Sequence, residues 1–126
     1  MIVLDTHVIA ELMRPQPEPA VLAWADGLVP AEVGITAMNE AEILHGLIRL
    51  PEGRRKQALL ESWQALVTAL LGDRVLAFHR EAAHWYGELL VRRKQFGRPI
   101  ATADAVIAAT ALAQGAQLAT RNVSDF

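Results

Sequence analysis

Three carboxylates occupy positions from which a hydrolytic centre could form. Asp5 directly follows the apolar run at residues 2–4, Glu42 lies in a helical stretch behind a second strand candidate, and Asp104 begins an otherwise apolar helix. Carboxylates gathered from separate elements repel one another unless a cation neutralises them. All-oxygen ligation favours Mg²⁺ or Mn²⁺ over zinc, with the remaining ligands supplied by water and substrate phosphate. These residues therefore indicate a metal site for phosphodiester hydrolysis, with Asp5, Glu42 and Asp104 as ligands.

Polar residues at the ends of two strand candidates could support such a centre. Thr6 lies beside Asp5 at the start of a helix, and Thr120 follows the last strand candidate. Asn122, two residues further on, offers an amide oxygen but no charge. We therefore expect Thr6 and Thr120 to be supporting residues, whereas no residue type identifies the substrate-binding contacts.

Each acid also has a purely structural interpretation. Asp5 could be an ordinary helix N-cap, Glu42 a solvated side chain, and Asp104 a charge that compensates the helix dipole. Glu40 and Glu42 are two residues apart, so they point to nearly opposite sides of a helix and only one can face inward. Gly46, one turn beyond Glu42, is unfavourable in a helix unless something approaches closely, which favours Glu42 as the functional residue.

The elements that must position these residues alternate between strand and helix. Strand candidates occur at residues 2–4, 33–36, 75–78 and 117–120. Helical patterns cover residues 6–13, 19–27, 38–50, 54–71, 80–96 and 103–114, the last with Thr102 as its expected cap. This alternation predicts an α/β fold with a parallel sheet covered by helices on both faces. In such sheets ligands bind beyond the carboxyl ends of the strands, which is where the polar residues lie.

Length and composition narrow the class of protein further. The chain has 126 residues, 52% of them hydrophobic, which suits one folded domain spanning residues 1–126. A net charge of −2 argues against nucleic-acid binding by bulk positive charge. The absence of cysteine excludes thiolate metal sites and fits the reducing cytoplasm. The longest apolar stretch, residues 105–113, is too short for the ~20 residues of a membrane span, so we expect no membrane association.

Four segments, in this order and spacing, resemble the PIN-domain endoribonucleases, and among them the toxins of type II toxin–antitoxin pairs of the VapC and FitB kind. The segments are Ile2-Val3-Leu4-Asp5-Thr6-His7-Val8-Ile9, Ala41-Glu42-Ile43-Leu44-His45-Gly46, Ala103-Asp104-Ala105-Val106-Ile107-Ala108 and Leu118-Ala119-Thr120-Arg121-Asn122. The resemblance extends from one end of the chain to the other. It implies a three-layer α/β/α fold with a central, mostly parallel sheet.

The resemblance also implies a function and partners. It implies a metal-dependent endoribonuclease whose catalytic residues are Asp5, Glu42, Asp104 and Asn122, the last at a position that is commonly a fourth acid. It further implies a homodimer, inhibited by a small antitoxin whose tail lies in the groove beside the acidic site, and bound to operator DNA only through that antitoxin. Asn122 departs from the usual acid, which puts a second metal position in doubt. The chain also ends earlier than expected, at Phe126, so a final C-terminal strand is expected to be missing.

One alternative function remains open. Asn122 favours a weakly active or inactive PIN-fold subunit that grips an antitoxin and strengthens its binding to operator DNA, whereas the three acids favour the nuclease. The basic clusters at residues 54–56 and 92–94 could border an RNA groove, although solvated helix ends explain them as well. The three tryptophans are expected to pack in the core or in a dimer interface; they are Trp24, Trp63 and Trp85.

Overall fold

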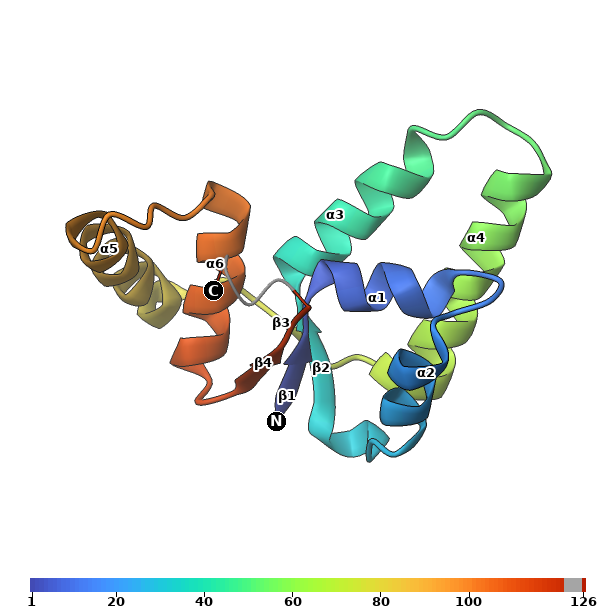
Figure 1. Cartoon of the computed structure of the whole chain (residues 1–126), viewed down its shortest axis with the longest axis horizontal. Helices are drawn as coiled ribbons and strands as arrows, with labels where there is room; N and C mark the ends of the chain where they lie inside the picture. Colours follow the sequence, from blue (N-terminus) through green and yellow to red (C-terminus); the bar gives the residue numbers. More distant parts are fainter. Residues whose placement is uncertain (122–125) are drawn as a thin grey trace.

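The computed structural model describes residues 1–121 and 126, which form a parallel sheet between helices (Figure 1). The strands are β1 (Ile2–Leu4), β2 (Val33–Thr36), β3 (Val75–Leu76) and β4 (Gln117–Ala119). The helices are α1 (Thr6–Met13), α2 (Pro19–Asp26), α3 (Ala37–Ile48), α4 (Arg54–Leu66), α5 (Arg80–Gln95) and α6 (Thr102–Ala113). A short 3₁₀ turn, Pro30–Glu32, precedes β2, and α4 continues into a π-helical turn, Val67–Leu71.

The sheet has the strand order β3-β2-β1-β4, and every neighbouring pair is parallel. β1 lies in the middle, with Val3 opposite Gly34 of β2 and Leu118 of β4. In Figure 1, α5 and α6 lie on one side of the sheet and α1, α2 and α4 on the other. The prediction of a three-layer α/β/α fold with a parallel sheet is therefore confirmed. Because the strands are parallel, the residues that follow β1, β2 and β4 meet at one edge of the sheet.

The hydrophobic core lies mainly between the sheet and the α1–α4 side. Leu4 of β1, Ile35 of β2 and Ile9 of α1 have no exposed surface, and Trp63 of α4 packs against the same cluster. On the other side, α6 buries Ile107 together with several alanines, whose small side chains let the helix lie close to the sheet. Because helices cover both faces of the sheet, the strands are continuous apolar runs in the sequence rather than alternations of apolar and polar residues.

Several predicted boundaries differ from the structure. Thr102 was expected to cap the last helix, but it is the first helical residue and Ala101 occupies the cap position without a side-chain hydrogen bond. The third strand ends at Leu76 rather than at residue 78, since only Val75 and Leu76 pair with β2. At the end of α4 the chain turns at Gly72, whose φ of 56° is a conformation that glycine adopts readily.

The tryptophans were expected in the core or in a dimer interface, and one of the three lies in the core. Trp63 is 4% exposed, whereas Trp24 and Trp85 are 42% and 40% exposed.

Within the described part of the chain, the helices are all too short or too polar to cross a membrane. Between residues 1 and 121, β4 forms one edge of the sheet. The described residues do not test the expectation that a final C-terminal strand is missing.

Candidate functional site

Asp5 lies at the carboxyl end of β1 with only 2% of its surface exposed. Its Oδ1 accepts a hydrogen bond of 2.8 Å from the backbone N–H of Thr6, so Asp5 is the N-cap of α1. Its Oδ2 accepts a second bond of 2.9 Å from the Thr120 hydroxyl at the end of β4. The imidazole Nδ1 of His7 lies 3.7 Å from the same Oδ2. One carboxylate therefore starts a helix and also joins the ends of two neighbouring strands.

Thr6 connects Asp5 to Glu42. The Thr6 hydroxyl donates a hydrogen bond of 2.7 Å to Glu42 Oε1, although the two residues are 36 positions apart. Glu42 lies on α3, which begins directly after β2, and its side chain is half-buried. The structure thus brings Asp5, Thr6, Glu42 and Thr120 together through three hydrogen bonds.

Asn39 also belongs to this cluster, and the sequence interpretation did not include it. It is fully buried, and its side-chain Nδ2 donates a hydrogen bond of 2.9 Å to the Thr6 hydroxyl oxygen. The signal available in the sequence was the spacing of Thr36 and Asn39. A threonine at the N-cap with an amide three residues later is typical of a capping box, which the structure contains.

The two remaining predicted site residues are Asp104 and Asn122. Asp104 lies in the first turn of α6, half-buried, on a helix that contacts α3, β2 and β4. Asn122 lies outside the described residues. Among the described residues, no three Asp, Glu or His side chains gather closely enough to hold one metal ion together. Thr6 links the carboxylates of Asp5 and Glu42, through its backbone N–H to the first and its hydroxyl to the second.

Comparison with known proteins places this arrangement in a family. The profile of the PIN domain matches residues 2–124 of the chain. The chain belongs to the PIN-domain family. It is 40% identical over all 126 residues to the VapC ribonuclease Y4jK of Sinorhizobium fredii (strain NBRC 101917 / NGR234), of which it covers 90%. It is 38% identical over the same length to the toxin FitB of Neisseria gonorrhoeae (strain ATCC 700825 / FA 1090), of which it covers 91%.

A solved structure of FitAB bound to an IR36 DNA fragment superimposes on this PIN domain with a TM-score of 0.91. The two chains are 38% identical, and the match covers 100% of this chain and 88% of the other. The predicted resemblance to PIN-domain proteins of the VapC and FitB kind is therefore confirmed.

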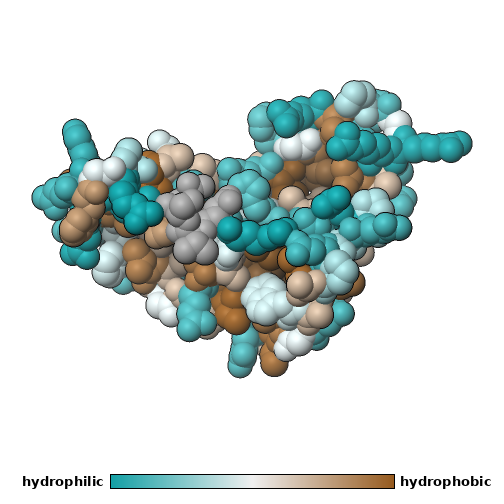
Figure 2. Space-filling view, in the orientation of Figure 1, coloured by the Kyte–Doolittle hydropathy of each residue, from teal (hydrophilic) through white to brown (hydrophobic). Residues whose placement is uncertain are grey.

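A groove of about 370 Å³ lies beside Glu42. Thr6, Glu42 and Gly46 line it, and apolar side chains from α1, α3 and α4 form much of its wall. Figure 2 shows this hydrophobic surface between α3 and α4, bordered by hydrophilic residues. Three arginines also line the groove: Arg14, Arg49 and Arg55. The lining thus combines one carboxylate with three guanidinium groups.

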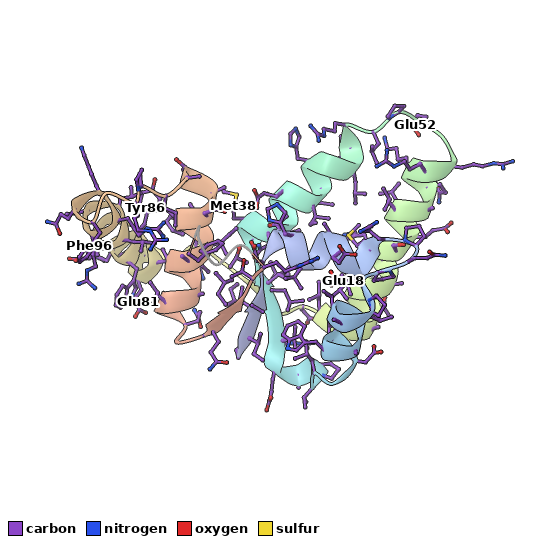
Figure 3. All side chains as sticks on the ribbon, viewed as in Figure 1. Glu18, Met38, Glu52, Glu81, Tyr86 and Phe96 are labelled. Carbon is purple, nitrogen blue, oxygen red and sulfur yellow. The ribbon has the colours of Figure 1, made fainter. Side chains whose placement is uncertain are left out.

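A second polar cluster, centred on Glu11, was also missed by the sequence interpretation. The Glu11 carboxylate contacts the guanidinium groups of Arg14 at 3.2 Å and Arg121 at 3.3 Å, and accepts a bond from the backbone N–H of Glu18. Arg121 also pairs with the Glu18 side chain at 2.6 Å. Figure 3 labels Glu18 near α1 and α2, on the side of the sheet opposite α5.

The Glu11 cluster lowers the pKa of the Glu11 carboxyl below its ordinary value. The largest cause is the hydrogen bond from the Glu18 backbone, which stabilises the charged form. Burial opposes the shift, and the nearby Arg14 and Arg121 charges favour it. Because Arg121 directly follows Thr120, the cluster anchors the end of β4 next to Asp5. No sequence pattern indicated this contact, since the two residues are 110 positions apart.

Proposed function

We propose that this PIN-domain protein is a divalent-metal-dependent endoribonuclease, the toxin of a toxin–antitoxin pair. The observation that carries the proposal is the pairing of the Asp5 and Glu42 carboxylates around Thr6 at the carboxyl ends of β1 and β2. The names of two relatives, a VapC ribonuclease and a toxin, support the same activity.

The donor atoms suit a hard divalent cation. Mg²⁺ keeps several waters and is usually held by one or two carboxylates together with substrate phosphate. Asp5 and Glu42 would supply those carboxylates, and Asp104 would approach from α6. When bound, Mg²⁺ or Mn²⁺ lowers the pKa of a coordinated water and offsets the charge of the phosphate. Asn122 would contribute an oxygen without charge, which favours one firmly held ion rather than two.

The other residues of the cluster would fix the two acids. The Thr120 hydroxyl and the Thr6 backbone N–H hold the two oxygens of Asp5, and the Thr6 hydroxyl holds one oxygen of Glu42. These donors restrict the rotamers of both carboxylates before substrate arrives. Such preorganisation is what a hydrolytic centre requires, because a small misplacement of a reacting group lowers the rate strongly.

The proposed partners follow from the same assignment. RNA is the substrate, and a small antitoxin is the inhibitor in the groove beside Glu42. The toxin is expected to be a cytoplasmic homodimer that reaches operator DNA only through its antitoxin. A solved relative that is bound to DNA as FitAB supports the assembly on DNA.

Cleavage of RNA by two variants on α3 tests the nuclease. We expect purified wild type to cut RNA with Mn²⁺ or Mg²⁺ and to stop when a chelator is added. Glu42→Gln should abolish cleavage, because the amide loses the negative charge near Thr6. Glu40→Gln, a matched change two residues away, should keep it. Equal activity in Glu42→Gln and wild type would contradict the assignment, as would cleavage that survives the chelator.

A second function is favoured by the DNA-bound relative. In this alternative, the chain is a weakly active or inactive subunit that binds an antitoxin and strengthens the binding of that antitoxin to operator DNA. A mobility-shift titration of operator DNA with antitoxin, with and without this chain, decides between the two together with the RNA assay. Tighter DNA binding with no RNA cleavage would favour the binding subunit, whereas cleavage would establish the nuclease.

A further inference from the structure

Asn39 holds its side chain in one orientation through contacts with Thr36. The Asn39 Oδ1 accepts bonds of 2.8 Å from both the backbone N–H and the hydroxyl of Thr36. A backbone N–H can only donate, so the side-chain atom facing it must be the amide oxygen. The Asn39 backbone N–H donates in turn to the Thr36 hydroxyl at 3.1 Å. The Asn39 Nδ2 therefore points away from Thr36 and towards Thr6.

This orientation fixes the direction of the next hydrogen bond. The Thr6 hydroxyl oxygen accepts from Asn39 Nδ2 at 2.9 Å. The hydroxyl has one hydrogen of its own, and it donates that hydrogen to Glu42 Oε1 at 2.7 Å. A continuous chain of donors thus runs from the end of β2 through Asn39 and Thr6 to the Glu42 carboxylate.

Asparagine is the side chain that this chain of donors requires. It must accept from Thr36 and donate to Thr6 at the same time, which an ionised aspartate cannot do because it only accepts. An aspartate there would also bury a second negative charge close to Glu42. The full burial of Asn39 excludes it from direct contact with a bound RNA strand.

We infer that Asn39 is a positioning residue, which orients the Glu42 carboxylate through the Thr6 hydroxyl. Its effect on cleavage rests on the proposed function, whereas its effect on Glu42 does not. Residues that orient metal-binding or reacting side chains from behind commonly affect activity by about 10- to 100-fold. We therefore expect Asn39→Ala to lower kcat for RNA cleavage on the order of 10- to 100-fold, with little change in KM.

The test is a double-mutant cycle of Thr6→Ala and Asn39→Ala. The first readout needs neither RNA nor metal: the side-chain carboxyl ¹³C resonance of Glu42, assigned by its loss in Glu42→Gln. We expect Asn39→Ala to move this resonance. We also expect Asn39→Ala to have no further effect on the resonance or on kcat once Thr6→Ala has removed the hydroxyl.

Thr36→Val is the control for a merely structural role. It removes the hydroxyl that caps α3 and lowers the melting temperature, but the Thr36 backbone N–H still orients Asn39 towards Thr6. We expect it to leave the Glu42 resonance near its wild-type position and cleavage close to wild type. If Asn39→Ala does not fold, Asn39→Leu replaces it in the cycle, because leucine is close to asparagine in shape but has no amide that could donate to Thr6.

The outcomes separate this inference from the proposed function. An unchanged Glu42 resonance in the Asn39 variant overturns the inference, whatever the RNA assay shows. A shifted resonance in a protein that cleaves no RNA supports the positioning of Glu42 and refutes the nuclease. Additive effects of the two substitutions on kcat would show that Asn39 does not act through Thr6, which also overturns the inference.

Discussion

At the scale of single residues, the Asp5 carboxylate has both a structural role and a proposed functional role. The sequence was compatible with Asp5 as a helix cap or as a site residue. In the structure, its two carboxylate oxygens accept hydrogen bonds from different donors. Oδ1 caps α1, while Oδ2 faces Thr120 across the sheet. The cap is a contact between neighbours in sequence and could be predicted. The bond to Thr120 spans 115 positions and depends on the pairing of β1 with β4.

Asn39 and Glu11 show why other residues could not be predicted. Both act through partners far along the chain, Thr6 for Asn39 and Arg121 for Glu11. A single sequence indicates local features such as caps, but it does not specify which side chains meet across a fold. Asp5 was easier to predict, because it directly follows a strand and a parallel sheet brings the ends of its strands to one edge.

The Glu11 cluster predicts a dependence of stability on pH. The pKa of the folded Glu11 carboxyl lies below its ordinary value of 4.5, so the hydrogen bond from the Glu18 backbone and the ion pairs with Arg14 and Arg121 stabilise the fold fully above that value. This contribution is lost as the pH falls through the lowered pKa, because protonation removes the charge. We expect Glu11→Gln to lower the melting temperature at pH 7, with a difference from wild type that shrinks towards pH 3. A difference that stays constant over this pH range would contradict the prediction.

At the scale of elements, α3 carries a glycine that the packing of the chain does not explain. A Cβ built at Gly46 meets nothing within 4 Å, so no neighbour in the described structure requires the absence of a side chain. Glycine in a helix interior costs about 0.5–1 kcal/mol relative to alanine. Gly46 lines the groove with Thr6 and Glu42, which suggests that a ligand approaches the backbone there.

Gly46→Ala is therefore expected to raise stability and lower activity. The melting temperature should rise, because alanine favours the helix by about 0.5–1 kcal/mol. The KM for RNA should increase, because the new methyl group projects into the groove. Gly87→Ala in α5 is a matched control, since its Cβ also meets nothing within 4 Å and it lies outside the groove. Equal KM values for the two variants would remove Gly46 from the binding surface.

The boundaries of elements were predicted least well where tertiary pairing decides them. The third strand is shorter than its apolar run, since only two of its residues pair with β2. The start of α6 was misplaced by one residue, because Thr102 lies inside the helix rather than at the cap. Helices with a clear apolar stripe, such as α4 with the buried Trp63, were predicted closely.

At the scale of the whole molecule, exposed apolar side chains predict self-association. Trp85 is 40% exposed, Val91 is 59% exposed and Phe96 is 74% exposed, and all three lie on α5 or at its end. Figure 3 shows Phe96 on the side of the molecule formed by α5, away from the sheet. Exposed apolar surface of this kind commonly marks an interface with another chain. We expect light scattering at micromolar concentration to give a dimer, and a monodisperse monomer would contradict this expectation.

The overall architecture could be predicted because its causes are general. Alternating strands and helices require crossovers of one hand, which give a parallel sheet with its ligand edge at the carboxyl ends. The order of the strands could not be predicted from periodicity, because each strand is only two to four residues long. That order places β1 between β2 and β4, and it therefore decides that Asp5 meets Thr120 and that Thr6 meets Glu42.

The most direct test of the central claim is the RNA cleavage rate of Asp5→Asn in Mn²⁺, measured together with its melting temperature. Asparagine caps helices as well as aspartate, and it removes a negative charge beside Glu42. We predict that cleavage is abolished while the melting temperature without metal is unchanged or higher. Asp26→Asn, on the exposed end of α2, should retain both properties of wild type. Cleavage at the wild-type rate by a folded Asp5→Asn variant would contradict the claim that this carboxylate belongs to a metal-dependent nuclease centre.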